Sequence, residues 1–335
     1  ATGGTASQFA FPTTVASGEG YAVTVKSHPA FPKQTCTVTN GAGTVGSTSV
    51  TDIGITCDTH RFKVKATVSG LDGTGLKLKN GPDEIAITTD GTYEFPTTVA
   101  SGDTYTVTTT GKPTDRSQTC TVSNGAGIVV DGDITDVAVT CVTDSFTVGG
   151  TVSGLTGSGL VLQNNGGDDL PISAPGGEFT FSTKIPSGEG YDVTVKTPPS
   201  GPSQTCTVSG GIGSVTNGNV LGVVVNCSVD SFTVSAEVSG LVGSGLVLQN
   251  NGGDDLPVNG NGTVAFPPVP SGEPYSVTVK THPTGPHQTC EVTNGGGTVT
   301  SGPISNVLVE CRTNTYTISG TIAGLTGGTI TLLNN

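Results

Sequence analysis

Residues 313–335 read TNTYTISGTIAGLTGGTITLLNN, and this stretch decides how the rest of the chain is organised. Near-copies of it occur at Asp58–Asn80 (DTHRFKVKATVSGLDGTGLKLKN), Thr143–Asn165 (TDSFTVGGTVSGLTGSGLVLQNN) and Val229–Asn251 (VDSFTVSAEVSGLVGSGLVLQNN). Each of those three copies is followed by a similar downstream sequence. Self-similarity at a fixed period is the signature of a repeat protein, so the chain is predicted to consist of tandem modules.

The eight cysteines give the length of the repeat. They form four pairs, each 21 positions apart: Cys36 and Cys57, Cys120 and Cys141, Cys206 and Cys227, and Cys290 and Cys311. If a module ends at its second cysteine, the complete modules span residues 58–141, 142–227 and 228–311, which are 84, 86 and 84 residues long.

The constant spacing favours one disulfide within each module over the many other pairings that eight cysteines permit. Zinc binding is the rival interpretation, but no CxxC pair accompanies these cysteines, and no histidine recurs beside them in all four modules. Closing a loop of this length stabilises a module by roughly 3 kcal/mol. Disulfides persist in oxidising compartments, so we expect a secreted protein or one displayed on a cell surface.

Residues 1–57 and 312–335 are predicted to be complementary parts of one further module. Phe9–Gly18 (FAFPTTVASG) matches Tyr93–Gly102 (YEFPTTVASG), which lies in the middle of a complete module. Residues 312–335 match only the beginning of one. The two parts together contain 81 residues and lack only the few that correspond to 166–170 (GGDDL). We therefore expect an incomplete first module and, at 312–335, the strands that complete it.

The hydrophobic pattern within a module has a period of two. Phe146, Val148, Gly150 and Val152 alternate with polar residues, as a strand with one buried face requires. Turn signals separate about seven such short segments, and no segment has a helical period. The predicted fold class is therefore all-β, with tandem β-sandwich modules of about seven strands and one disulfide each, and with one module split between the two chain ends.

Four tyrosines, Tyr21, Tyr105, Tyr191 and Tyr275, each follow Ser-Gly-x-x and open an alternating strand. This spacing resembles the tyrosine corner of immunoglobulin-like and fibronectin type III sandwiches, in which the hydroxyl bonds to nearby backbone. The alternative is a half-buried ring whose hydroxyl is in water. In either case the role is structural.

Three stretches of the module repeat along the chain: TVSGLTGSGLVLQNNGGDDL (151–170), IPSGEGYDVTV (185–195), and the QTC and NC that contain Cys206 and Cys227. In these residues the chain resembles the tandem immunoglobulin-like repeats of bacterial cell-surface and secreted proteins. The resemblance covers essentially the whole chain and implies stalks, adhesins or fibres.

Sequence motifs for chemistry are weak. The histidines His28, His60, His282 and His287 form no consistent pattern between modules, and no nucleophile, metal or phosphate motif is found, so we expect no enzyme, cofactor or metal. The pairs Asp168-Asp169 and Asp254-Asp255 follow Asn-Asn-Gly-Gly and are interpreted as turns, with calcium ligation or an acid/base pair as alternatives. Asn261-Gly262-Thr263 fits both a turn and a glycosylation acceptor.

Composition excludes two classes of partner. The net charge is −13, with charged residues at 12%, and basic residues do not cluster, which argues against nucleic acid. No apolar run approaches the 18 residues of a membrane span.

The expected function is polymerisation of the chain with copies of itself. The incomplete module would expose an apolar interior and unpaired strand edges, formed by Phe9, Phe11, Val15, Tyr21, Val23 and Val25. The donor segment carries Tyr316, Ile318, Ile322, Leu325, Ile330 and Leu332. Donation of these strands to the next copy resembles the logic of chaperone–usher pilins and predicts an extracellular filament.

Two alternatives remain at the level of sequence. The chain is a window from a longer, continuous tandem-repeat stalk, or its loops bind a surface glycan or a protein as an adhesin does.

Overall fold

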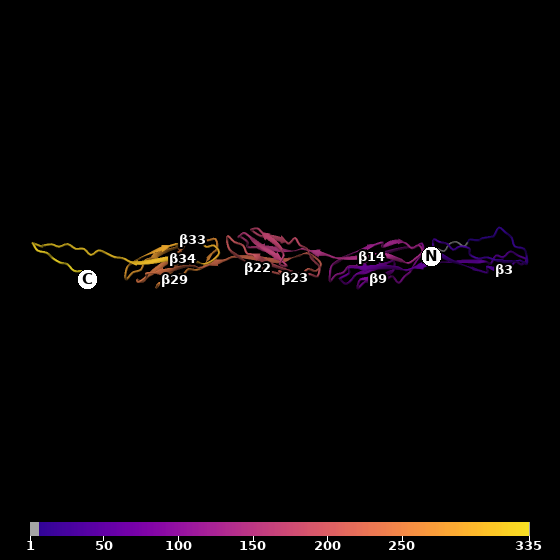
Figure 1. The fold of residues 1–335 in the computed structure, drawn as a ribbon, viewed down its shortest axis with the longest axis horizontal. Helices are drawn as coiled ribbons and strands as arrows, with labels where there is room; N and C mark the ends of the chain where they lie inside the picture. Colours follow the sequence, from indigo (N-terminus) through magenta and orange to yellow (C-terminus); the bar gives the residue numbers. More distant parts are fainter. Residues whose placement is uncertain (1–6, 335) are drawn as a thin grey trace. The chain divides into compact units, whose positions relative to one another are not determined.

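The structure is a computed structural model that describes residues 7–334, and every regular element in this range is a β-strand. Figure 1 shows the strands in successive groups, for example β9 with β14 and β29 with β33 and β34. The predicted fold class, tandem β-sandwich modules with one disulfide each, is confirmed. No helix in residues 7–334 is long and apolar enough to cross a membrane.

Each complete module consists of two four-stranded sheets and one short two-stranded pair. In the first, the sheet orders are β12-β14-β6-β9 and β13-β11-β7-β8, and the pair is β5 with β10. The bounds are β5 (Arg61–Phe62), β6 (Val64–Ser69), β7 (Lys77–Asn80), β8 (Asp83–Ala86), β9 (Gly91–Glu94), β10 (Val99–Ala100), β11 (Thr104–Gly111), β12 (Gln118–Ser123), β13 (Ala126–Ile128) and β14 (Ile134–Thr143).

The other two complete modules repeat this order. The second contains β15 (Ser145–Phe146), β16 (Val148–Ser153), β17 (Leu160–Asn164), β18 (Asp168–Ile172), β19 (Gly177–Thr180), β20 (Ile185–Pro186), β21 (Gly190–Thr197), β22 (Gln204–Ser209), β23 (Ile212–Ser214) and β24 (Val220–Val229). The third contains β25 (Ser231–Phe232), β26 (Val234–Ser239), β27 (Leu246–Asn250), β28 (Asp254–Val258), β29 (Gly262–Ala265), β30 (Val269–Pro270), β31 (Pro274–Thr281), β32 (Gln288–Thr293), β33 (Gly296–Thr298) and β34 (Ile304–Thr313).

The sequence predicts about seven strands in a sandwich, whereas the two four-stranded sheets of each complete module contain eight. The additional strand is β13, β23 or β33, which lies in the segment that the sequence suggests is a glycine-rich loop. It pairs with the strand that opens at the tyrosine, so that Tyr105 is opposite Gly127 and Tyr275 is opposite Gly297.

The core of each module lies between its two four-stranded sheets. In the first module, alternate residues of β6 are buried, and Val64, Ala66 and Val68 are no more than 2% exposed. Phe95 and Leu78 pack into the same cluster and are fully buried. β6 pairs in parallel with β14, the last strand of the module, with Ala66 beside Val137 and Val68 beside Val139.

Each disulfide joins neighbouring strands of one sheet. Cys120 and Cys141 are direct partners in the antiparallel pair β12 and β14, and their Cα atoms are 4.0 Å apart. In immunoglobulin domains the disulfide connects the two sheets. Here the disulfide lies within one sheet and does not connect the two.

Residues 7–57 form fewer strands than a complete module. They contain β1 (Gly20–Ala22), β2 (Gln34–Thr39), β3 (Ala42–Thr44) and β4 (Gly54–Thr59), in two separate two-stranded sheets, β1-β3 and β2-β4. Within this range only Cys36 is a buried hydrophobic residue. Residues 1–6 of the expected first module, and Asn335 of the expected donor segment, lie outside the described residues.

Two compact units make up the chain. One contains the residues up to Thr147 with Lys184–Gly190 and Ser214–Asn219. The other contains Val148–Thr183, Tyr191–Gly213 and the residues from Val220 onward. The hydrogen bond between Ser117 and Ser187 lies within the first unit, and that between Ser203 and Ser271 lies within the second.

Candidate assembly site

The segment 314–334 carries apolar side chains that the chain does not bury. Ile318, Ile322 and Leu332 are 82%, 58% and 71% exposed. The residues at the same positions of the third module, 84 residues earlier, are buried. These are Val234, Val238 and Leu248, at 0%, 1% and 0% exposure. The same sequence pattern therefore forms a core in one place and faces solvent in the other.

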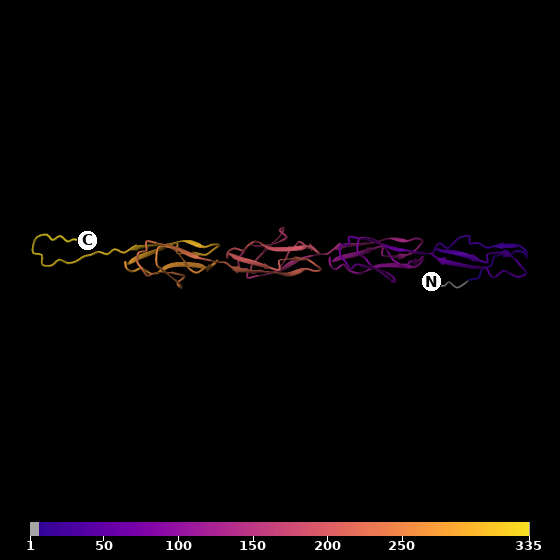
Figure 2. The same cartoon turned by 90° about the horizontal axis from the view of Figure 1, so that it is seen from below.

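The remaining predicted donor residues behave in the same way. Tyr316, Leu325 and Ile330 are 74%, 55% and 52% exposed, whereas Leu241 and Leu246, the counterparts of the last two, are buried. The expected strand pair is not formed in the single chain. No strand lies between residues 314 and 334, and both ribbon views draw this segment without arrows (Figures 1 and 2). A strand requires a hydrogen-bonded neighbour, and the predicted neighbour belongs to a second copy, so the donor strands remain a prediction.

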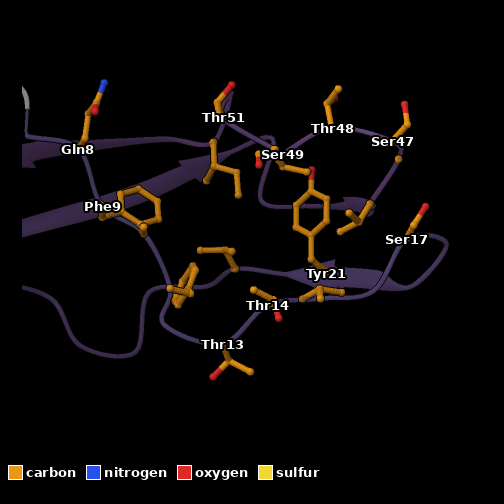
Figure 3. A pocket seen from close by; sticks show the side chains of 18 of the residues that line it. Gln8, Phe9, Thr13, Thr14, Ser17, Tyr21, Ser47, Thr48, Ser49 and Thr51 are labelled. Carbon is orange, nitrogen blue, oxygen red and sulfur yellow. The ribbon is translucent and has the colours of Figure 1, made fainter.

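Residues 7–57 enclose a cavity of about 760 Å³. Five of the six predicted acceptor residues line it: Phe9, Phe11, Val15, Tyr21 and Val23. The sixth, Val25, is half-buried and lies outside the lining. Figure 3 shows the rings of Phe9 and Tyr21 in this cavity, while Gln8 and Thr13 point away from it. Phe11 is 61% exposed, whereas its counterpart Phe95 is fully buried in the first complete module. The cavity thus lies where the first complete module has its core, since Phe95, Tyr105 and Val107, the counterparts of three lining residues, are buried there.

Two strand edges beside this cavity lack the neighbours that complete modules provide. In the first complete module β6 lies between β14 and β9, and β7 lies between β11 and β8. In residues 7–57 the counterpart of β14 is β4 and that of β11 is β1, and each pairs with one strand only. Residues 7–10, the counterpart of β9, form no strand. The places of β6 and β7 are therefore open.

Gln34 is a candidate site residue that sequence reasoning missed. Its counterpart Gln118 is buried, and its Oε1 accepts hydrogen bonds from the backbone N–H groups of Asp72 and Gly73 at 2.8 and 2.9 Å. Gln204 and Gln288 make the same bonds to the corresponding loops. The two loop residues that donate these bonds correspond to Thr326 and Gly327 in the C-terminal segment. The repetition of Gln-Thr-Cys in all four modules is the sequence signal that could have identified Gln34.

The four tyrosines pack against glycine. A Cβ on Gly127 would lie 2.9 Å from the ring of Tyr105, and Gly43, Gly213 and Gly297 are as close to the other three rings. The hydroxyl of Tyr105 donates to the carbonyl of Asn124 at 3.2 Å, and Tyr21 and Tyr191 make the corresponding contact. The partner lies 19 residues downstream. The tyrosines therefore hold the glycine-rich strand onto the sheet.

The predicted turn at the aspartate pairs is misplaced by two residues. Asn165 and Gly166 have positive φ and make the turn, whereas Asp168 and Asp169 open β18. A hydrogen bond from Lys196 holds the pKa of Asp169 below its usual value, and Lys280 does the same to Asp255. Within residues 7–334, no group of three or more histidine, cysteine or acidic side chains could hold a metal ion.

The histidines show no pattern that is common to all modules, although His28 and His282 occupy the same position in two of them. Each Nδ1 accepts from the backbone N–H of the first cysteine, at 3.0 and 3.1 Å. The side chain of Asn261 bonds to both backbone groups of Leu241, which is a structural role in a turn.

Comparisons with known proteins add little to this geometry. No family model and no curated protein matches the chain. Among solved structures, the Bacillus anthracis TIE protein is similar over 84% of this chain, with 12% identity and a TM-score of 0.44. The match spans 58% of the length of that protein. Two B repeat units of the Staphylococcus aureus collagen-binding protein match over 82% of this chain and 88% of their own, with 13% identity and a TM-score of 0.24. Neither likeness, at these scores, bears on function.

Proposed function

We propose that the protein is a structural subunit of an extracellular bacterial filament, in which the segment 314–335 of one copy completes the module 1–57 of the next. One observation carries the proposal: the apolar residues of this segment are exposed, and the module that lacks their counterparts contains an open cavity. The four disulfides support an oxidising, extracellular setting. The modules 58–141, 142–227 and 228–311 would be the complete sandwiches of each subunit.

The pairings within the complete modules support a particular register for the composite one. Because Val68 lies beside Val139, Ile322 of the donor is expected beside Ile55 of the acceptor. Because Leu248 lies opposite Val279, Leu332 is expected opposite Val25.

The composite module is also expected to contain the short two-stranded pair that β5 and β10 form in the first complete module. Since Phe62 pairs with Val99, Tyr316 is expected opposite Val15. The acceptor residues Val15 and Val25 thereby obtain partners, although Val25 does not line the cavity. These pairings make the donor segment a two-stranded insertion that fills both open places.

The interaction is strong enough for a stable filament. Burial of the six donor side chains contributes roughly 1.5–3 kcal/mol each, or on the order of 9–18 kcal/mol before ordering of the segment is subtracted. A contact between two different surfaces leaves a free donor segment and a free acceptor module at the ends of each pair, so it supports growth along a filament.

Substitution of Gly324 should weaken assembly without altering the subunit. Its counterparts Gly70, Gly154 and Gly240 have positive φ, and a Cβ on any of them would lie 2.2–2.4 Å from the carbonyl oxygen of the second cysteine. In the single chain Gly324 also has positive φ, with no atom within 4 Å of its Cβ position. We expect Gly324→Ala to weaken subunit affinity on the order of 100-fold, measured by analytical ultracentrifugation.

Gly320→Ala is the matched control. The residues at its position in two complete modules are Ala66 and Ala236, both fully buried, so the composite module should accept an alanine. Equal effects of the two substitutions would contradict the register proposed here.

The size of the native assembly tests the proposal directly. Full-length chains should form particles in multiples of 33.2 kDa that appear as filaments by electron microscopy. Denaturation in detergent without reductant should return single chains, because no disulfide links the copies. A protein that remains monomeric at micromolar concentration contradicts the proposal. Native material whose denatured chains are several times longer indicates a continuous stalk instead.

A further inference from the structure

Successive modules are joined at a buried serine. Ser101, Ser187 and Ser271 are 3%, 0% and 4% exposed. The hydroxyl oxygen of each accepts a hydrogen bond from a backbone N–H in the preceding module, and the donors are Lys33, Ser117 and Ser203 at 2.8, 2.8 and 2.9 Å. Each hydroxyl also donates to a carbonyl of its own module, as Ser101 does to Val130.

A second hydrogen bond completes each joint. The backbone N–H of the same serine donates to the residue that links the two modules. Ser101 donates to the carbonyl of His60 at 2.8 Å, Ser187 to that of Asp144 at 2.9 Å, and Ser271 to that of Asp230 at 2.8 Å. The serine therefore contacts the preceding module with both its hydroxyl and its backbone.

The counterpart of this serine in residues 7–57 is Ser17, which is exposed. The turn around it already has the geometry of a joint. Gly18 N–H donates to Val45 at 2.8 Å and Val45 N–H donates to Glu19 at 2.9 Å. The corresponding bonds around Ser101 have the same lengths, between Gly102 and Val129 and between Val129 and Asp103. The acceptor side of a joint is thus formed before any partner arrives.

The other side of a joint is formed at the end of the third module. Asn314 N–H donates to the carbonyl of His287 at 3.0 Å, as Asp230 N–H donates to Ser203 at 3.0 Å. Thr289 Oγ1 donates to Asn314 Oδ1 at 2.9 Å, as Thr205 does to Asp230 at 2.7 Å. Within residues 7–334 no partner is seen for the N–H of His287, which is exposed.

We propose that Ser17 of one copy docks on His287 and Asn314 of the copy that donates its tail, which forms at the subunit boundary the joint that already links the modules inside the chain. This inference rests on the proposed function, because a second copy of this chain is the partner. The Ser17 hydroxyl accepts from His287 N–H, and Ser17 N–H donates to the carbonyl of Asn314. The contact surface therefore includes the end of the third module as well as the inserted strands.

The test compares filaments of the full-length chain with filaments of Ser17→Ala. Loss of the hydroxyl leaves a buried N–H without a partner, so subunits should dissociate from diluted Ser17→Ala filaments about 10-fold to 100-fold faster than from the original ones. Ser101→Ala removes the same bond from an internal joint. Filaments of this variant should release subunits at the same rate as filaments of the original chain. The dissociation rate is followed by light scattering after dilution.

Hydrogen exchange at single amides gives a second readout. The amide of His287 should be protected in filaments of the original chain and should exchange readily in Ser17→Ala filaments, while the amides of Ser117 and Ser203 stay protected in both. If filaments of the original chain and of Ser17→Ala show equal dissociation rates and equal protection, the proposed joint at Ser17 is wrong, and the proposed function is unaffected. Absence of filaments from the original chain overturns the proposed function itself. If Ser17→Ala does not assemble, Ser17→Thr decides: restored assembly supports the joint, and no restoration overturns it.

Discussion

A chain that ends at Arg312 is expected to stay monomeric at concentrations where the full-length chain forms filaments. The truncation removes all six exposed donor residues and leaves the third module with its core, since that core contains no residue beyond Cys311. Without these side chains, the apolar burial that would hold two copies together is lost, so association at micromolar concentration should be abolished. Sedimentation velocity and electron microscopy measure the result, and long filaments of the truncated chain would falsify donation of the C-terminal strands.

A peptide of residues 313–335 is the control for this truncation. It should bind the truncated chain in a one-to-one ratio and stop the growth of full-length filaments, because it occupies the same cavity. Binding is measured by calorimetry. If the peptide neither binds the truncated chain nor stops the growth of full-length filaments, the cavity does not accept these strands.

The second large effect is expected from Ile322→Asp. The residues at its position in the complete modules are Val68, Val152 and Val238, all at most 4% exposed, so the composite module would have to bury an unpaired carboxylate. We expect subunit affinity to fall on the order of 1,000-fold or more. The isolated subunit should retain its thermal stability, because Ile322 is 58% exposed in it.

Leu333→Asp introduces the same charge in the same segment and serves as the matched control. Leu333 is 92% exposed, and its counterparts Gln163 and Gln249 are polar residues that are not fully buried. This variant should assemble nearly as well as the original chain. If both substitutions abolish filaments equally, charge repulsion rather than strand insertion is responsible.

The repeat, the disulfides and the sandwich were accessible from sequence because each depends on a periodic signal. Cysteine spacing identifies pairs such as Cys120 and Cys141, and alternation identifies strands such as β6. The strand β13 was not accessible, because its glycines carry no side chain and therefore show no alternation. It is held in place by the ring of Tyr105, from the neighbouring strand.

The apolar part of the candidate site could also be predicted, whereas its polar part could not. Ile322 and Phe11 follow from the hydrophobic pattern, because burial depends mainly on residue type and period. The roles proposed for Gln34 and Ser17 follow only from the contacts of Gln118 with Gly73 and of Ser101 with Lys33, which are 45 and 68 residues apart in the chain. A polar side chain does not reveal its partner in sequence.

The parallel pairing of β6 with β14 determines how a module responds to pulling. After the short strand β5, the chain enters the four-stranded sheet of the first complete module at β6 and leaves it at β14, and these two strands are direct neighbours. Tension applied through the chain therefore acts along the strands and loads the hydrogen bonds between them together, so they do not open one after another. If the composite module adopts this pairing, with the donated strand beside β4, a joint without a covalent bond resists mechanical rupture through shear in the same way as the modules beside it.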